Sequence, residues 1–200
     1  NKFSALIKDL KLINSPGRMG KGASVKIGML SAKGNWRLVM DADNAISIKE
    51  FNDKILPLIS SVSRSYDIII SSRYLDGTKW HPAMPFIRNL CERLINIFAR
   101  LIFKSRIKDF LLHFMCFSDE AAERVFTLIK DPGWSFSLEA LILGEKMSFK
   151  IKEVAVFISH KSGSHFRLSH YLQMIWETVK IRWRLIFDSY NLKLKNQSVK

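Results

Sequence analysis

Asp41 and Asp43 stand one residue apart, directly after the apolar run 36–40. Such a run predicts a buried β-strand. The two carboxylates at its end would then lie close together in the same small space. Alone they would repel each other and bind protons, a conflict that a divalent cation removes. Hard oxygen ligands of this kind suit Mg²⁺ or Mn²⁺, which also bind substrate phosphates. The alternative is a turn that caps the next helix, with Ser47 and Glu50 in capping-box spacing.

A glycine-rich basic loop, residues 17–22, precedes this strand and leads into a predicted helix. Backbone N–H groups at the start of a helix receive phosphate oxygens well, and nearby cations add charge. We therefore predict that Arg18, Gly20 and Lys21 contact a phosphate-bearing cofactor or substrate. The loop is not a P-loop, because no Ser or Thr follows Lys21. A flexible strand-to-helix turn is the alternative interpretation.

The elements that position these residues alternate along the chain. Strands are expected at 11–14, 36–40, 67–70, 114–117 and 149–158. Helices are expected at 3–10, 23–32, from 47 with a kink at Pro57, 86–103, 119–129, 137–147 and 166–187. This alternation predicts an α/β fold on a largely parallel sheet, with 36–40 as its central strand. The carboxyl ends of parallel strands form one ligand crevice, which is where the two aspartates would lie.

Composition narrows the class of partner. The 200 residues suffice for one core, and the formal net charge of +14 predicts attraction to nucleic acid, nucleotide sugars or an anionic bilayer. No aromatic-basic recognition motif accompanies the charge, so nucleic acid is not expected as a partner. Cys91 and Cys116 have no metal-ligand spacing, which favours free thiols in a reducing compartment. No apolar run approaches the roughly 18 residues typical of a membrane span.

The loop, helix, strand and aspartate pair together resemble glycosyltransferase family 2. The run that starts at Asn14 reads N-x(5)-G-K-G-A-x-V-x-x-G-M-x-x-A-x-G, and a strand into Asp-Ala-Asp follows it. The resemblance is greatest to the branch that includes dolichyl-phosphate glucosyltransferases and polyprenyl-phosphate mannosyltransferases. It continues in the family's order through residues 72–74, 109–122, 134–139, 153–156 and 160–164.

The resemblance implies a Rossmann-like nucleotide-diphospho-sugar transferase fold, called GT-A. It implies a metal-dependent, inverting hexosyltransferase that uses a nucleotide-diphosphate sugar as donor and a polyprenyl or dolichyl phosphate as acceptor. Asp43 would bind Mg²⁺ or Mn²⁺, and Asp41 would support the metal or the ribose. The metal and nearby cations would stabilise the charge that develops on the departing diphosphate.

Further roles follow from the same resemblance. Arg73 and Arg88 match arginines that hold the acceptor's phosphate, and Glu139 matches a catalytic carboxylate. His160 and Ser164 would lie beside the donor's diphosphate. The alternatives are solvated surface cations for the two arginines and a structural histidine at position 160.

Several positions depart from the family pattern. Asn44 and Ala45 replace the residues usual after Asp-Ala-Asp, which puts a third metal contact in doubt. His113 stands where a glycine is usual, and Ser137 replaces a carboxylate. The family's first strand and its Asp-Asp motif are expected before the first residue of this chain. These departures favour, as an alternative, an inactive homologue that acts as a basic membrane-associated module. A transferase of the same fold that acts on a glycan is a second alternative, which loss of the Arg73 and Arg88 phosphate clamp would favour.

The final helix combines a wide apolar stripe with basic residues and tryptophans at its flank. This pattern is typical of a helix that lies in a membrane interface, although packing on the sheet is the alternative. We expect a catalytic domain over 1–165, an interfacial helix over 166–188 and a polar tail over 189–200. The resulting prediction is a peripheral enzyme at the cytoplasmic face of an anionic membrane.

Overall fold

The computed structural model describes residues 11–14, 17–61, 65–81, 85–159, 168–187 and 190. Its main sheet has the strand order β1-β4-β2-β5, formed by β1 (Trp36–Val39), β4 (Met115–Ser118), β2 (Ile68–Ser72) and β5 (Ile151–Ala155). β4 runs antiparallel to both of its neighbours, whereas β2 and β5 are parallel. The α/β class is therefore confirmed, but the sheet is mixed.

β1 lies at the edge of this sheet within the described chain, so its predicted central position is wrong. Four residues of β4 are fully buried between β1 and β2. An apolar run shows that a strand is buried, but it carries no information about which strand pairs with it. β1, β2 and β5 still share one direction, so their carboxyl ends meet at one edge.

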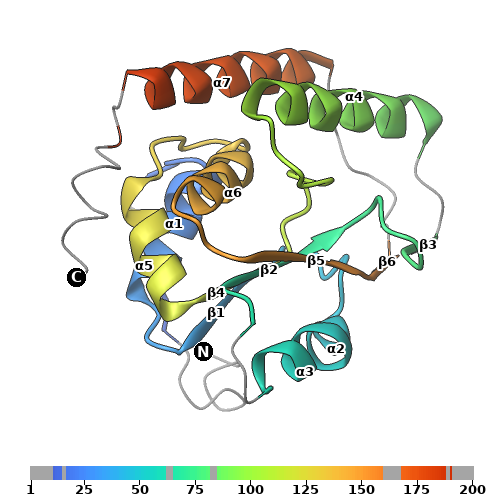
Figure 1. The fold of residues 1–200 in the computed structure, drawn as a ribbon, viewed down its shortest axis with the longest axis vertical. Helices are drawn as coiled ribbons and strands as arrows, with labels where there is room; N and C mark the ends of the chain where they lie inside the picture. Colours follow the sequence, from blue (N-terminus) through green and yellow to red (C-terminus); the bar gives the residue numbers. More distant parts are fainter. Residues whose placement is uncertain are drawn as a thin grey trace.

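Helices cover both faces of the sheet (Figure 1). One face carries α1 (Lys21–Ser31), α5 (Asp119–Leu128) and α6 (Phe136–Lys146), and the other carries α2 (Ile48–Glu50), the π-helical turn η1 (Phe51–Ile55) and α3 (Leu56–Ile59). Within β2, Ile68 and Ile70 join the first core and Ile69 joins the second. A strand that is covered on both faces reads as a continuous apolar run, which is what residues 68–70 show.

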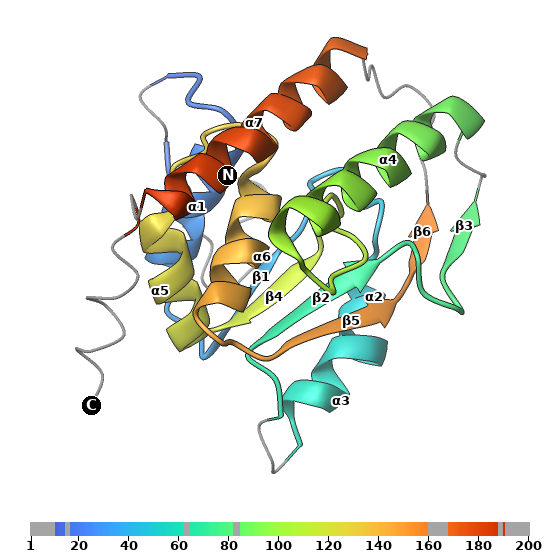
Figure 2. The ribbon, with the colours of Figure 1, turned by 45° about the horizontal axis from the view of Figure 1, so that its top comes forward.

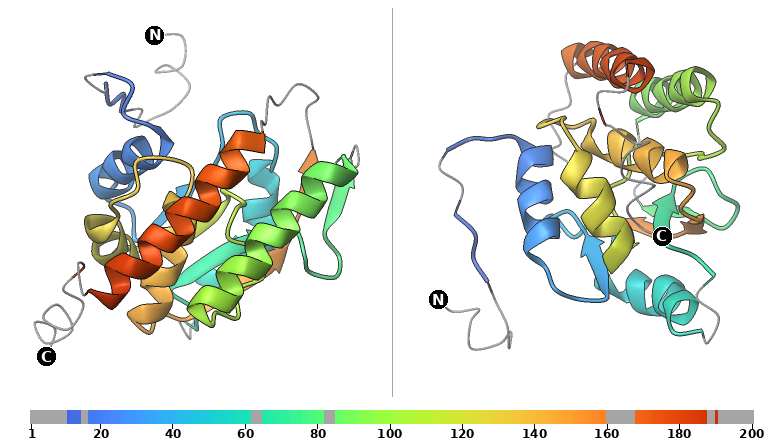
Figure 3. Two further views of the ribbon diagram at one scale, coloured as in Figure 1. Left: turned by 90° about the horizontal axis from the view of Figure 1, so that it is seen from above. Right: turned by 60° about the vertical axis from the view of Figure 1, so that its left-hand side comes forward.

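Two long helices form a further layer over α6. α4 (Phe86–Phe103) and α7 (Leu168–Ile186) lie side by side in every view (Figures 2 and 3). The bounds of α4 match the predicted helix. Its buried positions include the polar Glu92 and Asn96 beside Ile95, Ala99 and Phe103, whereas six of its large apolar side chains are exposed. Exposed apolar residues of α4 are Phe86, Ile87, Leu90, Leu94, Ile97 and Leu101, and those of α7 are Leu172, Ile175, Trp176, Trp183 and Ile186.

Smaller elements differ from the prediction. A second, two-stranded sheet pairs β3 (Lys79–His81) with β6 (Phe157–Ser159), so the expected strand 149–158 is split in two. Residues 11–14 form neither helix nor strand, contrary to expectation. Ser118 caps α5, since its Oγ accepts a hydrogen bond from Ala121 N. The expected helix 3–10 lies outside the described residues, as does the tail beyond residue 187 apart from Tyr190.

Candidate active site

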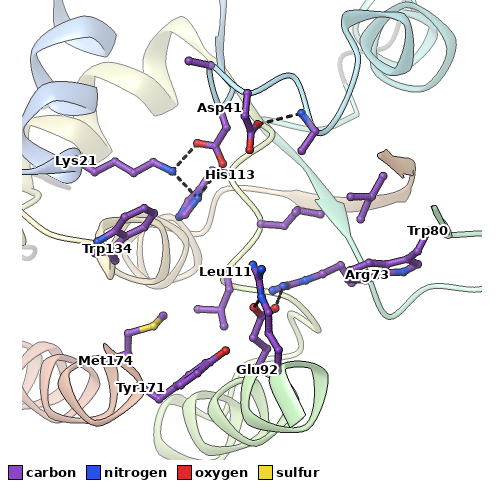
Figure 4. A pocket seen from close by; sticks show the side chains of 16 residues that line it. Lys21, Asp41, Arg73, Trp80, Glu92, Leu111, His113, Trp134, Tyr171 and Met174 are labelled. Atoms are coloured by element: carbon purple, nitrogen blue, oxygen red, sulfur yellow. Dashed lines mark hydrogen bonds and ion pairs between the residues drawn. The ribbon is translucent and has the colours of Figure 1, made fainter. Parts of the chain in front are cut away.

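A cavity of about 400 Å³ opens at the carboxyl ends of β1 and β2 (Figure 4). Asp41 and Asp43 follow β1 into it, and Arg73 follows β2. The remaining polar and aromatic side chains of its wall come from α1, β3, α4, α7 and two loops, and they are Lys21, Trp80, Arg88, Glu92, His113, Trp134 and Tyr171. The structure thus brings together the two aspartates, Lys21 and both arginines that the sequence singled out.

The Asp41 end of the cavity is a compact charge cluster. Lys21 Nζ lies 2.5 Å from Asp41 Oδ1 and 2.8 Å from His113 Nδ1. It also lies 4.7 Å from the centroid of the Trp134 ring, a cation–π contact. Burial raises the pKa of Asp41, but the hydrogen bonds and charges of His113 and Lys21 outweigh it and lower this pKa to about 2. Asp41 is therefore a carboxylate at neutral pH.

His113 Nδ1 lies 2.8 Å from Lys21 Nζ and 3.4 Å from Asp41 Oδ2. Toward the lysine this nitrogen accepts a hydrogen bond and toward the aspartate it donates one, so the two neighbours favour opposite tautomers of the ring. Burial and the adjacent Lys21 charge lower the pKa of His113 despite Asp41, which keeps the ring neutral. The His113 ring stacks on the Phe136 ring, with 5.1 Å between the two ring centroids. Its Nε2 is buried without a hydrogen-bond partner among the described residues. The bulk at position 113 thus forms part of the cavity wall.

Asp43 is more exposed than Asp41. Its Oδ1 accepts a hydrogen bond from Ala45 N at 3.0 Å, as in a turn at a strand end. The two carboxylates fit a hard divalent cation, because Mg²⁺ sites often use one or two carboxylates and take the remaining ligands from water and substrate phosphates. Within the described chain no third His, Cys, Asp or Glu joins them to complete a metal site. Lys21 shares Asp41 Oδ1, so a cation at this pair would compete with the ammonium for that oxygen.

The glycine loop packs against residues 131–133, a contact that the sequence did not predict. Gly22 N donates to Gly133 O and Ala23 N to Pro132 O, so loop carbonyls already occupy N–H groups of the first turn of α1. A Cβ at Gly20 would lie 2.3 Å from Pro132 O, and its φ of +88° also favours glycine. Gly20 therefore serves close packing against the loop that carries Trp134, and its contact with a phosphate stays a prediction. Arg18 is exposed and does not line the cavity.

Arg73 is buried, with 4% of its side chain exposed. Its Nε donates to Asp109 Oδ2 and its Nη2 to Asp109 Oδ1, each at 2.6 Å, and its Nη1 donates to Glu92. Burial lowers the pKa of the Arg73 guanidinium, but the charge of Asp109 outweighs this and raises it. Three of its five donors are thus committed to carboxylates.

Arg88 lies one α4 turn before Glu92 and is more accessible. Its Nε donates to Glu92 Oε1 at 2.9 Å, with 24% of the side chain exposed. Burial and the like charge of Arg73 lower the pKa of Arg88, so this cation gains from an anionic ligand. Glu92 therefore connects both arginines, a role the sequence reading missed. The signal was available as the i, i+4, i+8 polar series of Arg88, Glu92 and Asn96 on an otherwise apolar helix.

Glu139 does not line the cavity. It is fully buried in α6, and its Oε2 accepts hydrogen bonds from Lys130 N and Asp131 N at 3.0 and 2.7 Å. Its Oε1 accepts from Tyr190 Oη and, at 3.3 Å, from Arg184 Nη1. This arrangement positions the loop that carries Trp134 rather than a reacting atom. His160 and Ser164, the other predicted donor contacts, lie outside the described residues.

Comparison with known proteins agrees with this geometry. The model of glycosyl transferase family 2 matches residues 1–126. The chain belongs to this family. Dolichyl-phosphate β-glucosyltransferase of Dictyostelium discoideum is 30% identical over 188 residues, which cover 92% of this chain and 57% of that protein. The Saccharomyces cerevisiae enzyme of the same name is 26% identical, over 94% and 59% of the two chains. The family 2 chain described here thus spans a little over half the length of these relatives.

The fold of this family 2 chain also matches solved structures. Glucosyl-3-phosphoglycerate synthase from Mycobacterium tuberculosis, crystallised with UDP, superposes with a TM-score of 0.54 at 13% identity, over 90% of this chain and 57% of that one. The same synthase with Mn²⁺, UDP-glucose and phosphoglyceric acid gives a TM-score of 0.54, with the same coverage. The likeness shows the GT-A fold that the sequence predicted.

Proposed function

We propose that this chain carries the transfer site of a dolichyl-phosphate β-glucosyltransferase. The donor is a nucleotide-diphosphate glucose and the acceptor is a dolichyl or related polyprenyl phosphate. One observation carries the proposal: a single cavity has the Asp41–Asp43 pair at one end and the Arg73–Arg88 pair at the other. A donor diphosphate and an acceptor phosphate could be held there on opposite sides of one sugar. The names of the relatives support glucose and dolichyl phosphate.

The residues of the cavity divide the chemistry between its two ends. Mg²⁺ or Mn²⁺ held by Asp41 and Asp43 would supply Lewis-acid stabilisation of the leaving diphosphate. Lys21 adds a fixed positive charge at the same end. Arg88 orients the acceptor phosphate, whose oxygen is already anionic and needs positioning more than a base. Arg73, held by Asp109, fixes Glu92 and so the guanidinium of Arg88. Direct displacement at the anomeric carbon would invert its configuration.

The outer helices support a peripheral position on a membrane. No helix among the described residues is long and apolar enough to cross a bilayer. α4 and α7 instead present adjacent exposed apolar rows, with Trp176 and Trp183 58% and 63% exposed. Basic side chains such as Arg93, Arg100 and Lys180 flank these rows, as at an anionic interface. We place this face on the cytoplasmic leaflet, where a polyprenyl phosphate reaches the cavity from the lipid.

The aspartate pair provides the test. We expect Asp43→Asn to weaken Mn²⁺-dependent binding of UDP-glucose to the full chain at least tenfold, on the order of a lost metal contact, measured by titration calorimetry. Asp53→Asn is the matched control, because this exposed aspartate lies in η1 and does not line the cavity. Equal Mn²⁺-dependent binding by wild type and Asp43→Asn would rule out the metal role.

A further inference from the structure

A second cavity, of about 440 Å³, lies beside α4 and shares Arg73 with the first. Its other basic side chains are Arg93 and Arg100 from α4 and Lys108 from the loop after α4. Asp76 is its single acidic lining residue. The cavity therefore carries a clear excess of positive charge, although it has no part in the proposed transfer.

The three basic residues beside Arg73 are not paired with a carboxylate among the described residues, although Asp76 lines the same cavity. Arg73 is occupied by Asp109 and Glu92, but within the described residues Arg93, Arg100 and Lys108 form no side-chain ion pair. Like charges held around one concave site repel each other, so an anion that enters lowers their energy. The site is complementary to a compact group with more than one negative oxygen.

The geometry favours a phosphate as that group. Arg93 and Arg100 are seven residues apart on α4, about two helical turns, so both guanidiniums emerge on the same side. Tyr74 orients the first of them, since the guanidinium carbon of Arg93 lies 5.4 Å from the ring centroid of Tyr74. A planar guanidinium binds two phosphate oxygens at once.

The surroundings of the cavity indicate where the phosphate comes from. Ile97 lines the cavity and is 49% exposed, and Leu94 and Leu101 beside it on α4 are 56% and 73% exposed. A phosphate carried by acyl chains would satisfy both the basic cavity and this apolar row. A free phosphate would leave the apolar row in water.

We propose that the cavity between α4 and the loop after β2 binds the phosphate headgroup of an anionic phospholipid. This lipid is a bound neighbour and not a substrate, because Asp109 and Glu92 hold Arg73 between the two cavities. Its headgroup anchors α4 at a fixed depth and aligns the acceptor cavity with the bilayer. The inference rests on the proposed membrane position of α4, but not on the donor chemistry at Asp41 and Asp43.

The test is sedimentation of the full chain with phosphatidylcholine vesicles that contain or lack phosphatidic acid. We expect the double variant Arg93→Ala/Arg100→Ala to bind the phosphatidic-acid vesicles about thirtyfold more weakly than wild type, which is the scale of two charges at a membrane interface. Lys49→Ala/Lys54→Ala is the matched control, because it removes the same charge from exposed positions on the opposite face of the sheet. The affinity of this control for the vesicles should change less than threefold, because salt screens exposed charges that lie far from the bilayer.

A second variant separates a built site from diffuse attraction. Arg93→Lys/Arg100→Lys keeps the charge and the fold but loses the planar fork, so it should also bind phosphatidic-acid vesicles several-fold more weakly. Wild-type binding by this variant, or an equal loss in the Lys49 and Lys54 control, would overturn the site. Inorganic phosphate that displaces the protein from the vesicles at equal phosphate concentration would overturn the lipid as the source.

The same samples separate this inference from the proposed function. Mn²⁺-dependent binding of UDP-glucose should be unchanged in both arginine double variants, since neither residue lines the first cavity. Lost vesicle binding with intact donor binding supports the second site. If wild type binds the donor but no vesicles, the membrane position fails and the phospholipid site fails with it. If wild type binds vesicles but no donor, the proposed transfer chemistry fails while the phospholipid site stands.

Discussion

The two ends of the first cavity each contain a lysine or arginine paired with an aspartate, but in opposite environments. At one end, Lys21 and Asp41 keep 23% and 37% of their side chains exposed and are joined by one 2.5 Å contact. At the other, Arg73 and Asp109 keep 4% and 0% exposed and are joined by two 2.6 Å hydrogen bonds. Asp109 also accepts from the backbone N–H groups of Arg73 and Leu111.

This difference separates a site that can exchange partners from one that cannot. Surface ion pairs are worth little and re-form easily with other ions, so the lysine at the Asp41 end can give way to a cation or diphosphate. A buried pair has already lost its hydration, and removing one partner strands the other charge. The charge and hydrogen bonds of Arg73 overcome the effect of burial and lower the pKa of Asp109. In the proposed transfer, direct contact with the acceptor phosphate therefore falls to Arg88, and Arg73 positions the Arg88 side chain through Glu92.

The largest effect is expected from Asp109→Asn. This change keeps the shape of the side chain but leaves the buried Arg73 with Glu92 as its only carboxylate. We expect the free energy of unfolding to fall by about 3–5 kcal/mol, as for other broken buried pairs. Urea denaturation at neutral pH measures it.

Asp41→Asn is the matched change at the other end of the cavity. It should lower the free energy of unfolding by about 1 kcal/mol or less, because its ion pair is partly exposed. Equal losses in the two variants would show that the two ends do not differ as described.

An intermediate effect is expected from Glu92→Gln. Glu92 accepts from both Arg73 and Arg88 and has 6% of its side chain exposed. Replacing its charge should cost about 2 kcal/mol of unfolding free energy, typical of hydrogen bonds to charged groups. Glu120→Gln is the control, because Glu120 forms an i, i+4 pair with Arg124 on a helix surface and is 54% exposed. That control should cost about 0.5 kcal/mol or less in the same urea experiment.

The sequence predicted which residues meet in the cavity better than it predicted how the surrounding helices and strands pack. Asp41 and Arg73 each follow a buried apolar run, and parallel strands bring their carboxyl ends together, so periodicity and topology rules suffice to unite them. The bounds of α4 were also predictable from the helical spacing of its apolar residues. The side of α4 that faces the protein was not predictable, because the helix buries Glu92 and Asn96 and exposes Leu94. Period alone does not distinguish a core from a membrane as the apolar partner.

Two further gaps in the prediction have the same origin in long-range contacts. The position of β4 between β1 and β2 depends on pairings between residues about 50–80 apart, which no local pattern encodes. Gly20 and Gly22 stand at the start of a helix, as phosphate-binding glycines do. In the structure they accommodate the carbonyls of residues 131–133, a segment more than 100 residues away, which the sequence did not predict. Composition and spacing cannot separate these two uses of glycine.

The smallest expected effect is on the pH dependence of stability. The pKa of Asp41 is about 2 in the folded chain, below its ordinary value of 3.8, so its contribution is complete above pH 3.8 and is lost as the pH falls toward 2. Because the side chain is 37% exposed, we discount this contribution to about 1 kcal/mol. The unfolding free energy of Asp41→Asn, measured in urea at a series of pH values, should therefore fall about 1 kcal/mol less than that of wild type between these limits. Parallel curves would show that Lys21 and His113 do not stabilise the Asp41 carboxylate, and the two ends of the cavity would then differ in burial alone.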